Sequence, residues 1–102
     1  RNFRGCAVGR ANGGAKLGAR VALVERDRLG GDCLWHGCVP SKALVRAARV
    51  AHEMRAAGRY GLTAADPRPD LAQVMAHVRD VVAGIAPHDS PERFRGLGVD
   101  VI

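Results

Sequence analysis

The stretch that decides the fold is GGDCLWHGCVPSK, residues 30–42. It places two cysteines five positions apart, between a glycine pair and a Pro-Ser-Lys run. In a regular α-helix, Cα atoms five residues apart lie roughly 8–9 Å from each other, whereas a disulfide tolerates about 7 Å at most. A bridge between Cys33 and Cys38 therefore requires a distorted helical turn, which Gly37 permits.

The spacing alone leaves three interpretations of the cysteine pair open. A short loop closed under constraint is easily reduced, and a helix that begins beside it favours thiolate over thiol, which is the chemistry of a redox dithiol. The two residues would otherwise be inert free thiols. A third interpretation is a zinc site formed by Cys33, His36 and Cys38, although a fourth ligand at the usual spacing is missing and structural zinc sites favour shorter gaps.

The full string resembles the active-site segment of the FAD-dependent pyridine nucleotide–disulfide oxidoreductases (class I), which include mercuric reductase and dihydrolipoamide dehydrogenase. The specific part is Cys-x4-Cys-Val-Pro-Ser-Lys, and the resemblance extends from about Leu17 to the C-terminus. It implies an α/β fold: a partial Rossmann-like FAD-binding domain, with an incomplete doubly wound sheet and long helices. We expect residues 1–102 to be the N-terminal part of that domain, with no second domain, because enzymes of this family are several times longer.

The resemblance also implies a route for electrons. In the intact enzyme, NAD(P)H reduces FAD, and the flavin passes electrons to a Cys33–Cys38 disulfide and on to a disulfide or metal-ion substrate. Cys38 is implied to lie beside the flavin and Cys33 to be the outer, interchange thiol. Lys42 is implied to lie near the flavin and support hydride transfer. The chain alone lacks the remaining domains of the family, so we expect it to be inactive in isolation.

Residues implied to bind FAD lie on both sides of the first cysteine. Glu25 ends the predicted strand 20–25 and suits the adenosine ribose, whose hydroxyls a carboxylate accepts from. Glycine allows close backbone approach to a pyrophosphate. The implied set is Glu25, Gly30, Gly31, Asp32, Cys38 and Lys42, and no resident metal is expected.

The N-terminal residues depart from the family pattern. The fingerprint Gly-x-Gly-x-x-Gly should fall near Asn2, Arg4 and Ala7, none of which is glycine. The segment 12–14, Asn-Gly-Gly, is a poor helix interior. We therefore expect the first β-turn-α element, residues 1–16, to be diverged or scrambled.

Downstream, the pattern predicts helices and a final strand. One helix is expected from about Cys33 toward Gly58, a plausible C-cap. A second, amphipathic helix follows Asp70 as N-cap, and a short third one begins at Ser90 and Pro91. A strand is expected to begin at Val99, unpaired within the chain.

Composition limits the function further. The net charge is +6 and arginines outnumber lysines fourteen to two, but no basic run is interleaved with stacking residues, which favours a solvated surface over a nucleic-acid site. No apolar run reaches transmembrane length and no signal peptide is visible, so we expect a cytoplasmic protein. The expected partners are a small-molecule or metal-ion substrate and, in the intact family, a second subunit of a homodimer, with no nucleic acid or membrane.

An alternative is a non-catalytic helical binding or assembly module derived from the same family. It would use the Val-, Leu- and Met-rich face of the helix after Asp70 as a docking surface. The sequence leaves open which substrate the family chemistry would serve, and whether the nicotinamide donor is NADH or NADPH.

Overall fold

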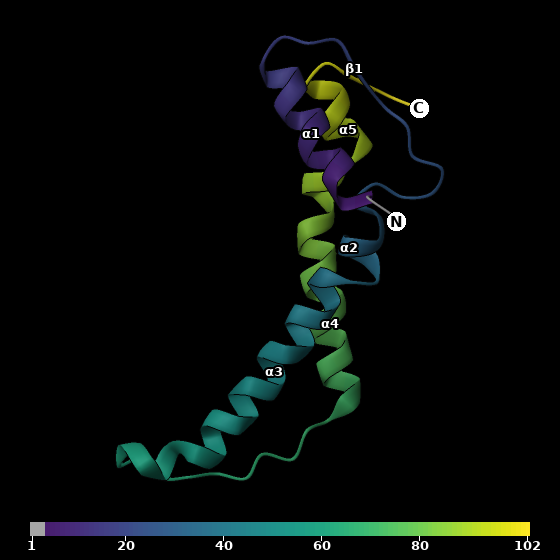
Figure 1. Cartoon of the computed structure of the whole chain (residues 1–102). Coiled ribbons are helices and arrows are strands. Elements are labelled where there is room, and N and C mark those ends of the chain that lie inside the picture. The colour runs from purple at the N-terminus through teal and green to yellow at the C-terminus, as the bar shows by residue number, and fades with distance from the viewer. Residues whose placement is uncertain (1–3) are drawn as a thin grey trace.

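The computed structural model describes residues 4–102, with side chains from residue 9 onward. The chain is elongated, 57 × 27 × 26 Å, and two long helices leave one end of it as an open hairpin (Figure 1). In chain order the elements are α1 (Arg4–Lys16), β1 (Val21–Leu23), α2 (Gly31–Trp35), α3 (Cys38–Ala56), the 3-10 helix η1 (Ala57–Tyr60), α4 (Leu71–Ile85), the 3-10 helix η2 (Ala86–Asp89), α5 (Pro91–Gly96) and β2 (Val99–Val101).

The two strands form a parallel pair, as a Rossmann-like unit requires. Val21 lies opposite Val99 and Leu23 opposite Val101. The ladder continues past the strands, since Glu25 N–H donates to the Ile102 carbonyl at 2.9 Å and Ile102 N–H to the Leu23 carbonyl at 2.9 Å. The predicted strand 20–25 is thus confirmed in a shorter form, whereas the expectation that the final strand is unpaired is wrong. The fold is a partial α/β domain of Rossmann-like type.

A small hydrophobic core holds this sheet against α1 and α5. Its most buried members are Phe94 and Val99, at 0% and 2% exposure. They pack with Ala11, Leu23 and Leu29. Because Leu29 belongs to this cluster, the loop between β1 and α2 is anchored to the core just before the glycine pair.

The N-terminal helix contains the segment that reads as a poor helix interior. Residues 12–14 lie inside α1, although each glycine in a helix interior costs about 1 kcal/mol relative to alanine. The packing explains the difference: a Cβ on Gly14 would lie 3.0 Å from Val21 Cγ2, so the glycine lets the helix approach β1 closely. Of the expected fingerprint positions, Arg4 and Ala7 fall in α1, and Asn2 lies outside the described residues.

The helix expected from about Cys33 toward Gly58 is two helices, because the distortion expected between the cysteines is a complete break. The Asp32 carbonyl accepts from the amides of both His36, at 2.9 Å, and Gly37, at 2.6 Å, which closes α2 and turns the chain before α3. A Cβ at Gly37 would lie 3.0 Å from that carbonyl oxygen. The break therefore depends on a glycine at position 37, and it falls between the two cysteines.

At the far end, α3 continues into η1, and the left-handed residue that ends it is Gly61, with φ 76°, rather than Gly58. The predicted caps of the following helices are confirmed. Asp70 Oδ1 accepts from the amides of Ala72 at 2.9 Å and Gln73 at 3.3 Å, and Ser90 Oγ accepts from Arg93 N–H at 3.2 Å. No helix in residues 4–102 is long and apolar enough to cross a membrane.

Candidate dithiol site

The broken turn brings the two cysteines together. Cys33 lies within α2, and Cys38 is the first residue of α3. Cys38 lies close enough to Cys33 to shift the pKa of its thiol through both its side chain and its backbone N–H. Both are free thiols, Cys33 half-buried and Cys38 exposed. A pair that a regular helix would hold too far apart is thereby placed within contact distance.

The proton on Cys33 is held more tightly than in an isolated cysteine. The hydrogen bond with Cys38 raises the pKa of the Cys33 thiol, and partial burial and the charge of Cys38 raise it further. The Cys38 amide and the Lys42 ammonium lower the pKa of Cys33. We expected the adjacent helix start to favour a thiolate. For Cys33 the net shift is the reverse, because the interaction between the two sulfurs dominates.

Lys42 lies one helical turn after Cys38, on the same side of α3. Its ammonium is close enough to lower the pKa of Cys33, and its side chain is exposed. Ser41, between them, donates from Oγ to the carbonyls of Gly37 at 2.7 Å and Cys38 at 3.2 Å. The sequence analysis assigned Ser41 no role; its hydroxyl fastens the first turn of α3 to the break.

Three of the residues predicted to bind the cofactor line one small hollow beside the dithiol. It measures about 50 Å³. Its lining is Glu25, Asp27, Arg28, Gly31, Asp32, Trp35 and His36. Glu25 Oε1 accepts from Asp27 N–H at 3.2 Å, which turns the chain away after β1. The hollow has room for one polar group and is too small to hold a whole dinucleotide.

The glycine pair is arranged differently from the expectation. Gly30 is buried with φ 91°, and a Cβ there would lie 2.4 Å from Leu34 Cδ2. The Gly31 amide donates to the Arg28 carbonyl at 3.2 Å. Among the residues that the structure describes, the amides of Asp32 and Cys33 have no hydrogen-bond acceptor. These two amides are thus available as donors to an anionic group such as a pyrophosphate.

Asp32 and His36 form the remaining polar pair at this edge. Asp32 Oδ1 and His36 Nδ1 are 3.9 Å apart, and the side chains are 72% and 65% exposed. An ion pair this exposed contributes little to stability. Among the side chains of residues 9–102, no group of three or more His, Cys, Asp or Glu could hold a metal ion, so the zinc ligand set of the third interpretation is not assembled.

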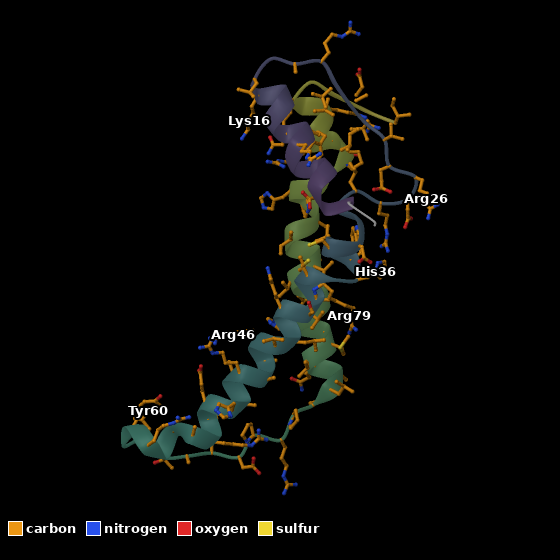
Figure 2. All side chains as sticks on the ribbon, viewed as in Figure 1. Lys16, Arg26, His36, Arg46, Tyr60 and Arg79 are labelled. Atoms are coloured by element: carbon orange, nitrogen blue, oxygen red, sulfur yellow. The ribbon has the colours of Figure 1, made fainter. Side chains whose placement is uncertain are left out.

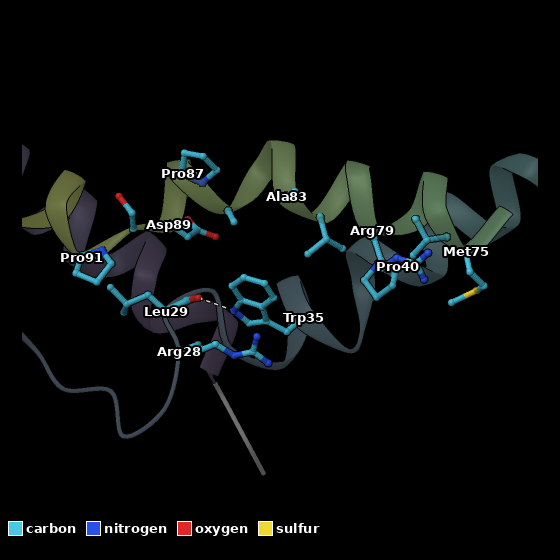
Figure 3. A pocket seen from close by; sticks show the side chains of 14 residues that line it. Arg28, Leu29, Trp35, Pro40, Met75, Arg79, Ala83, Pro87, Asp89 and Pro91 are labelled. Atoms are coloured by element: carbon cyan, nitrogen blue, oxygen red, sulfur yellow. Dashed lines mark hydrogen bonds between the residues drawn. The ribbon is translucent and has the colours of Figure 1, made fainter. Parts of the chain in front are cut away.

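Trp35 is a site residue that the sequence analysis missed. Its indole Nε1–H donates to the Leu29 carbonyl at 2.8 Å, and the Arg28 guanidinium lies 4.2 Å from the ring centroid (Figure 3). The available signal was that the one tryptophan of the chain lies between the two cysteines. A buried indole N–H usually requires an acceptor, and the preceding loop is the nearest source of carbonyls.

Beyond Trp35 lies a larger, mostly apolar groove of about 800 Å³. One wall is formed by Leu29, Trp35 and Pro40, and the other by Met75, Val78 and neighbouring residues of α4 (Figure 3). Elsewhere the arginines are spread along the molecule; Arg26, Arg46 and Arg79 stand on three different segments (Figure 2).

The dithiol turn, its lysine and the acidic strand end define the class of protein: a flavoprotein-type disulfide oxidoreductase. The comparisons support this class. A dihydrolipoyl dehydrogenase of Zymomonas mobilis is 50% identical over 72 residues, which are 71% of this chain and 16% of that protein. Dihydrolipoyl dehydrogenase 2 of Haloarcula marismortui is 56% identical over 59 residues, 58% of this chain and 12% of that protein.

The structure is similar to LpdA from Mycobacterium tuberculosis, with a TM-score of 0.72 and 25% identity, over 94% of this chain and 20% of that one. No family model matches. The chain belongs to the FAD-dependent pyridine nucleotide–disulfide oxidoreductase family. It spans about a sixth of the length of the first curated relative, 16%.

Proposed function

We propose that this chain forms the N-terminal part of the FAD-binding domain of a flavoprotein disulfide reductase. The intact enzyme would move electrons between NAD(P)H and a disulfide or metal-ion substrate through FAD and a Cys33–Cys38 disulfide. The observation that carries the proposal is the hydrogen-bonded cysteine pair, held by a break in the helix beside the Glu25 hollow. The names of the relatives favour a dihydrolipoyl group as the substrate dithiol.

The residues of this edge fit FAD by their chemistry. The Glu25 carboxylate would accept from ribose hydroxyls, and the amides of Asp32 and Cys33 would donate to the pyrophosphate. Bound there, FAD supplies a carrier that takes up and returns an electron pair. The Lys42 ammonium would favour negative charge on the neighbouring sulfur.

The cysteine chemistry follows from the geometry. Two electrons and two protons convert the Cys33–Cys38 bond to two thiols. A Cys33 thiolate then attacks a substrate disulfide, forming a mixed disulfide and releasing one substrate thiol. Cys38 attacks Cys33 in turn, which releases the second substrate thiol and restores the Cys33–Cys38 bond. Run in reverse, the same steps oxidise a substrate dithiol.

A spectral experiment on the intact protein that carries this sequence tests the proposal. We expect the purified protein to be yellow and to develop a long-wavelength absorption band on two-electron reduction, as a Cys38 thiolate contacts the flavin. Cys38→Ser should abolish this band. Cys33→Ser, the matched control, has no disulfide to reduce, so its Cys38 thiolate should give the band with oxidised flavin before any reductant is added. An unchanged band in Cys38→Ser contradicts the assignment of Cys38, and a colourless protein contradicts FAD binding.

A second candidate function is an assembly module, favoured by the apolar side chains exposed on the helical hairpin. Val45 on α3 is 66% exposed and Leu71 on α4 is 71% exposed. Light scattering with and without FAD separates the two candidates. A folded oligomer that binds no flavin favours assembly, whereas a flavin-dependent homodimer in the cytoplasm is what the reductase proposal expects.

A further inference from the structure

Trp35 connects the dithiol turn to the hydrophobic core. Its indole N–H donates at 2.8 Å to Leu29, whose own side chain is only 7% exposed and packs in the core cluster. In the described part of the chain, no other side-chain hydrogen bond joins residues 33–38 to residues 25–30. The Arg28 guanidinium covers the indole ring. Trp35 is therefore the one hydrogen-bonding side chain in the described residues that links the turn to the FAD edge, beside the apolar packing of Leu34, which is 2% exposed.

The turn needs such an anchor because its own structure is short. α2 has five residues, far fewer than a helix requires to be stable by itself. The break at residues 36–37 is held by backbone bonds that return to Asp32, inside the same turn. These bonds fix the internal shape of the turn but not its position on the domain.

We propose that Trp35 is a positioning residue that sets the position of the Cys33–Cys38 turn against the FAD-binding edge. This rests on the proposed function and extends it. The indole lines both the small hollow beside Glu25 and the apolar groove toward α4. A shift of the ring thus moves the amides of Asp32 and Cys33, which would hold the pyrophosphate, together with Cys38, which would face the flavin.

The test uses Trp35→Phe in the intact protein, because phenylalanine keeps a ring in the groove and removes only the N–H donor. We expect the dissociation constant for FAD to rise about three- to tenfold, as the loss of one partly buried hydrogen bond implies. At saturating FAD, the long-wavelength band of the two-electron-reduced protein should weaken, because Cys38 no longer lies at the same place relative to the flavin. A purely structural role would lower the melting temperature and leave that band unchanged.

Met75→Leu is the matched control, since Met75 lines the same groove from α4. It should leave both the FAD dissociation constant and the band unchanged. An unchanged constant and band in Trp35→Phe, or equal effects in the two variants, would overturn the proposal. If Trp35→Phe fails to fold, Arg28→Gln, which uncovers the ring but keeps the hydrogen bond, should raise the FAD dissociation constant about twofold, and no change would overturn the proposal.

Failure of this proposal is distinguishable from failure of the proposed function. If the unmodified protein binds no FAD, the function itself is wrong. If the unmodified protein binds FAD and Trp35→Phe binds it equally well with the same band, the reductase assignment stands and only the role of Trp35 is lost.

Discussion

The dithiol turn and the distal hairpin are built in opposite ways. The hairpin consists of two long regular helices, α3 and α4, with a loop between them (Figure 1). The turn at residues 30–38 contains a left-handed glycine, a five-residue helix and a break. The Asp32 carbonyl accepts the helical bond from His36 N–H and also a bond from Gly37 N–H, five residues on, which departs from the helical pattern.

The reactive cysteines lie in the irregular turn at residues 30–38. A regular helix spaces Cys33 and Cys38 too far apart, so the pair forms only where the helix is interrupted. In the hairpin, the regular helices leave apolar side chains such as Val45 and Leu71 exposed. If this contrast holds, replacing a glycine should destabilise the turn much more than the hairpin.

The largest effect is expected for Gly30→Ala, compared with Gly61→Ala. Both glycines have positive φ, 91° and 76°, but a Cβ on Gly30 would lie 2.4 Å from Leu34 Cδ2, whereas a Cβ on Gly61 meets nothing within 4 Å. Backbone strain costs each variant about 1–2 kcal/mol, and Gly30→Ala also overpacks the buried Leu34, adding about 1–3 kcal/mol. Denaturant unfolding measures the free energy of unfolding of both variants. Equal losses of that free energy in Gly30→Ala and Gly61→Ala would contradict the difference between the two regions.

The next comparison is Gly37→Ala against Gly58→Ala. A Cβ on Gly37 would lie 3.0 Å from the Asp32 carbonyl oxygen, whereas Gly58 has open space. We expect Gly37→Ala to cost about 1–3 kcal/mol and to slow oxidation of the dithiol to a disulfide, since the break that pairs the cysteines is disturbed. Gly58→Ala should be neutral or stabilising by up to about 1 kcal/mol. Normal disulfide formation in Gly37→Ala would show that the break tolerates a side chain.

The sequence predicted much of the regular structure because local signals there agree. Asp70 and Ser90 were recognised as caps, and the helix after Asp70 by its 3–4 apolar spacing, because cap and pattern act over a few neighbouring residues. The strand 20–25 was recognised from its short apolar run. Its pairing with residues 99–101 was missed, since no local feature specifies contact between segments so distant in sequence.

The failures fall where tertiary contacts override local propensity. The segment 12–14 reads as a poor helix, yet α1 contains it because Gly14 packs closely on Val21. The cysteine spacing predicts a distorted turn at Gly37 but not that the helix divides there, and no local feature predicts the Trp35–Leu29 hydrogen bond. At the site, the motif identified Cys33, Cys38 and Lys42, and the structure brings these residues together.

The pKa of Cys33 gives a pH-dependent prediction. It is raised mainly by the hydrogen bond with Cys38, so alkylation of Cys33 in the reduced protein should become fast only at a higher pH than for an ordinary thiol. Cys38→Ala removes that cause and should move the pH midpoint of alkylation down. Lys42 makes the weakest contribution and lowers the pKa of Cys33. Lys42→Met should therefore move the pH midpoint of alkylation up slightly. Mass spectrometry of iodoacetamide-treated protein follows Cys33 alone, and a midpoint unmoved by Cys38→Ala would contradict the shared hydrogen bond.

The same raised pKa affects stability with a definite sign. A thiol whose pKa is higher in the folded state stabilises the fold while it is protonated, below its unfolded pKa. That stabilisation is lost as the pH rises through the folded pKa of Cys33. The reduced protein should therefore lose stability toward alkaline pH more steeply than Cys33→Ser, and parallel pH–stability curves would show that the interaction is absent in solution.

The smallest effect is expected in the hairpin. Arg55 Nε lies 2.6 Å from Asp66 Oδ1, and Arg55 Nη2 donates to the Pro67 carbonyl at 3.4 Å. The two side chains are 52% and 81% exposed, so solvent screens the pair. Asp66→Asn should change the free energy of unfolding by less than about 1 kcal/mol and leave flavin binding untouched, because the hairpin end holds none of the residues placed at the cofactor edge. A loss as large as that of Gly37→Ala would mean that the hairpin and the dithiol turn are energetically coupled, and the contrast between the two regions would no longer hold.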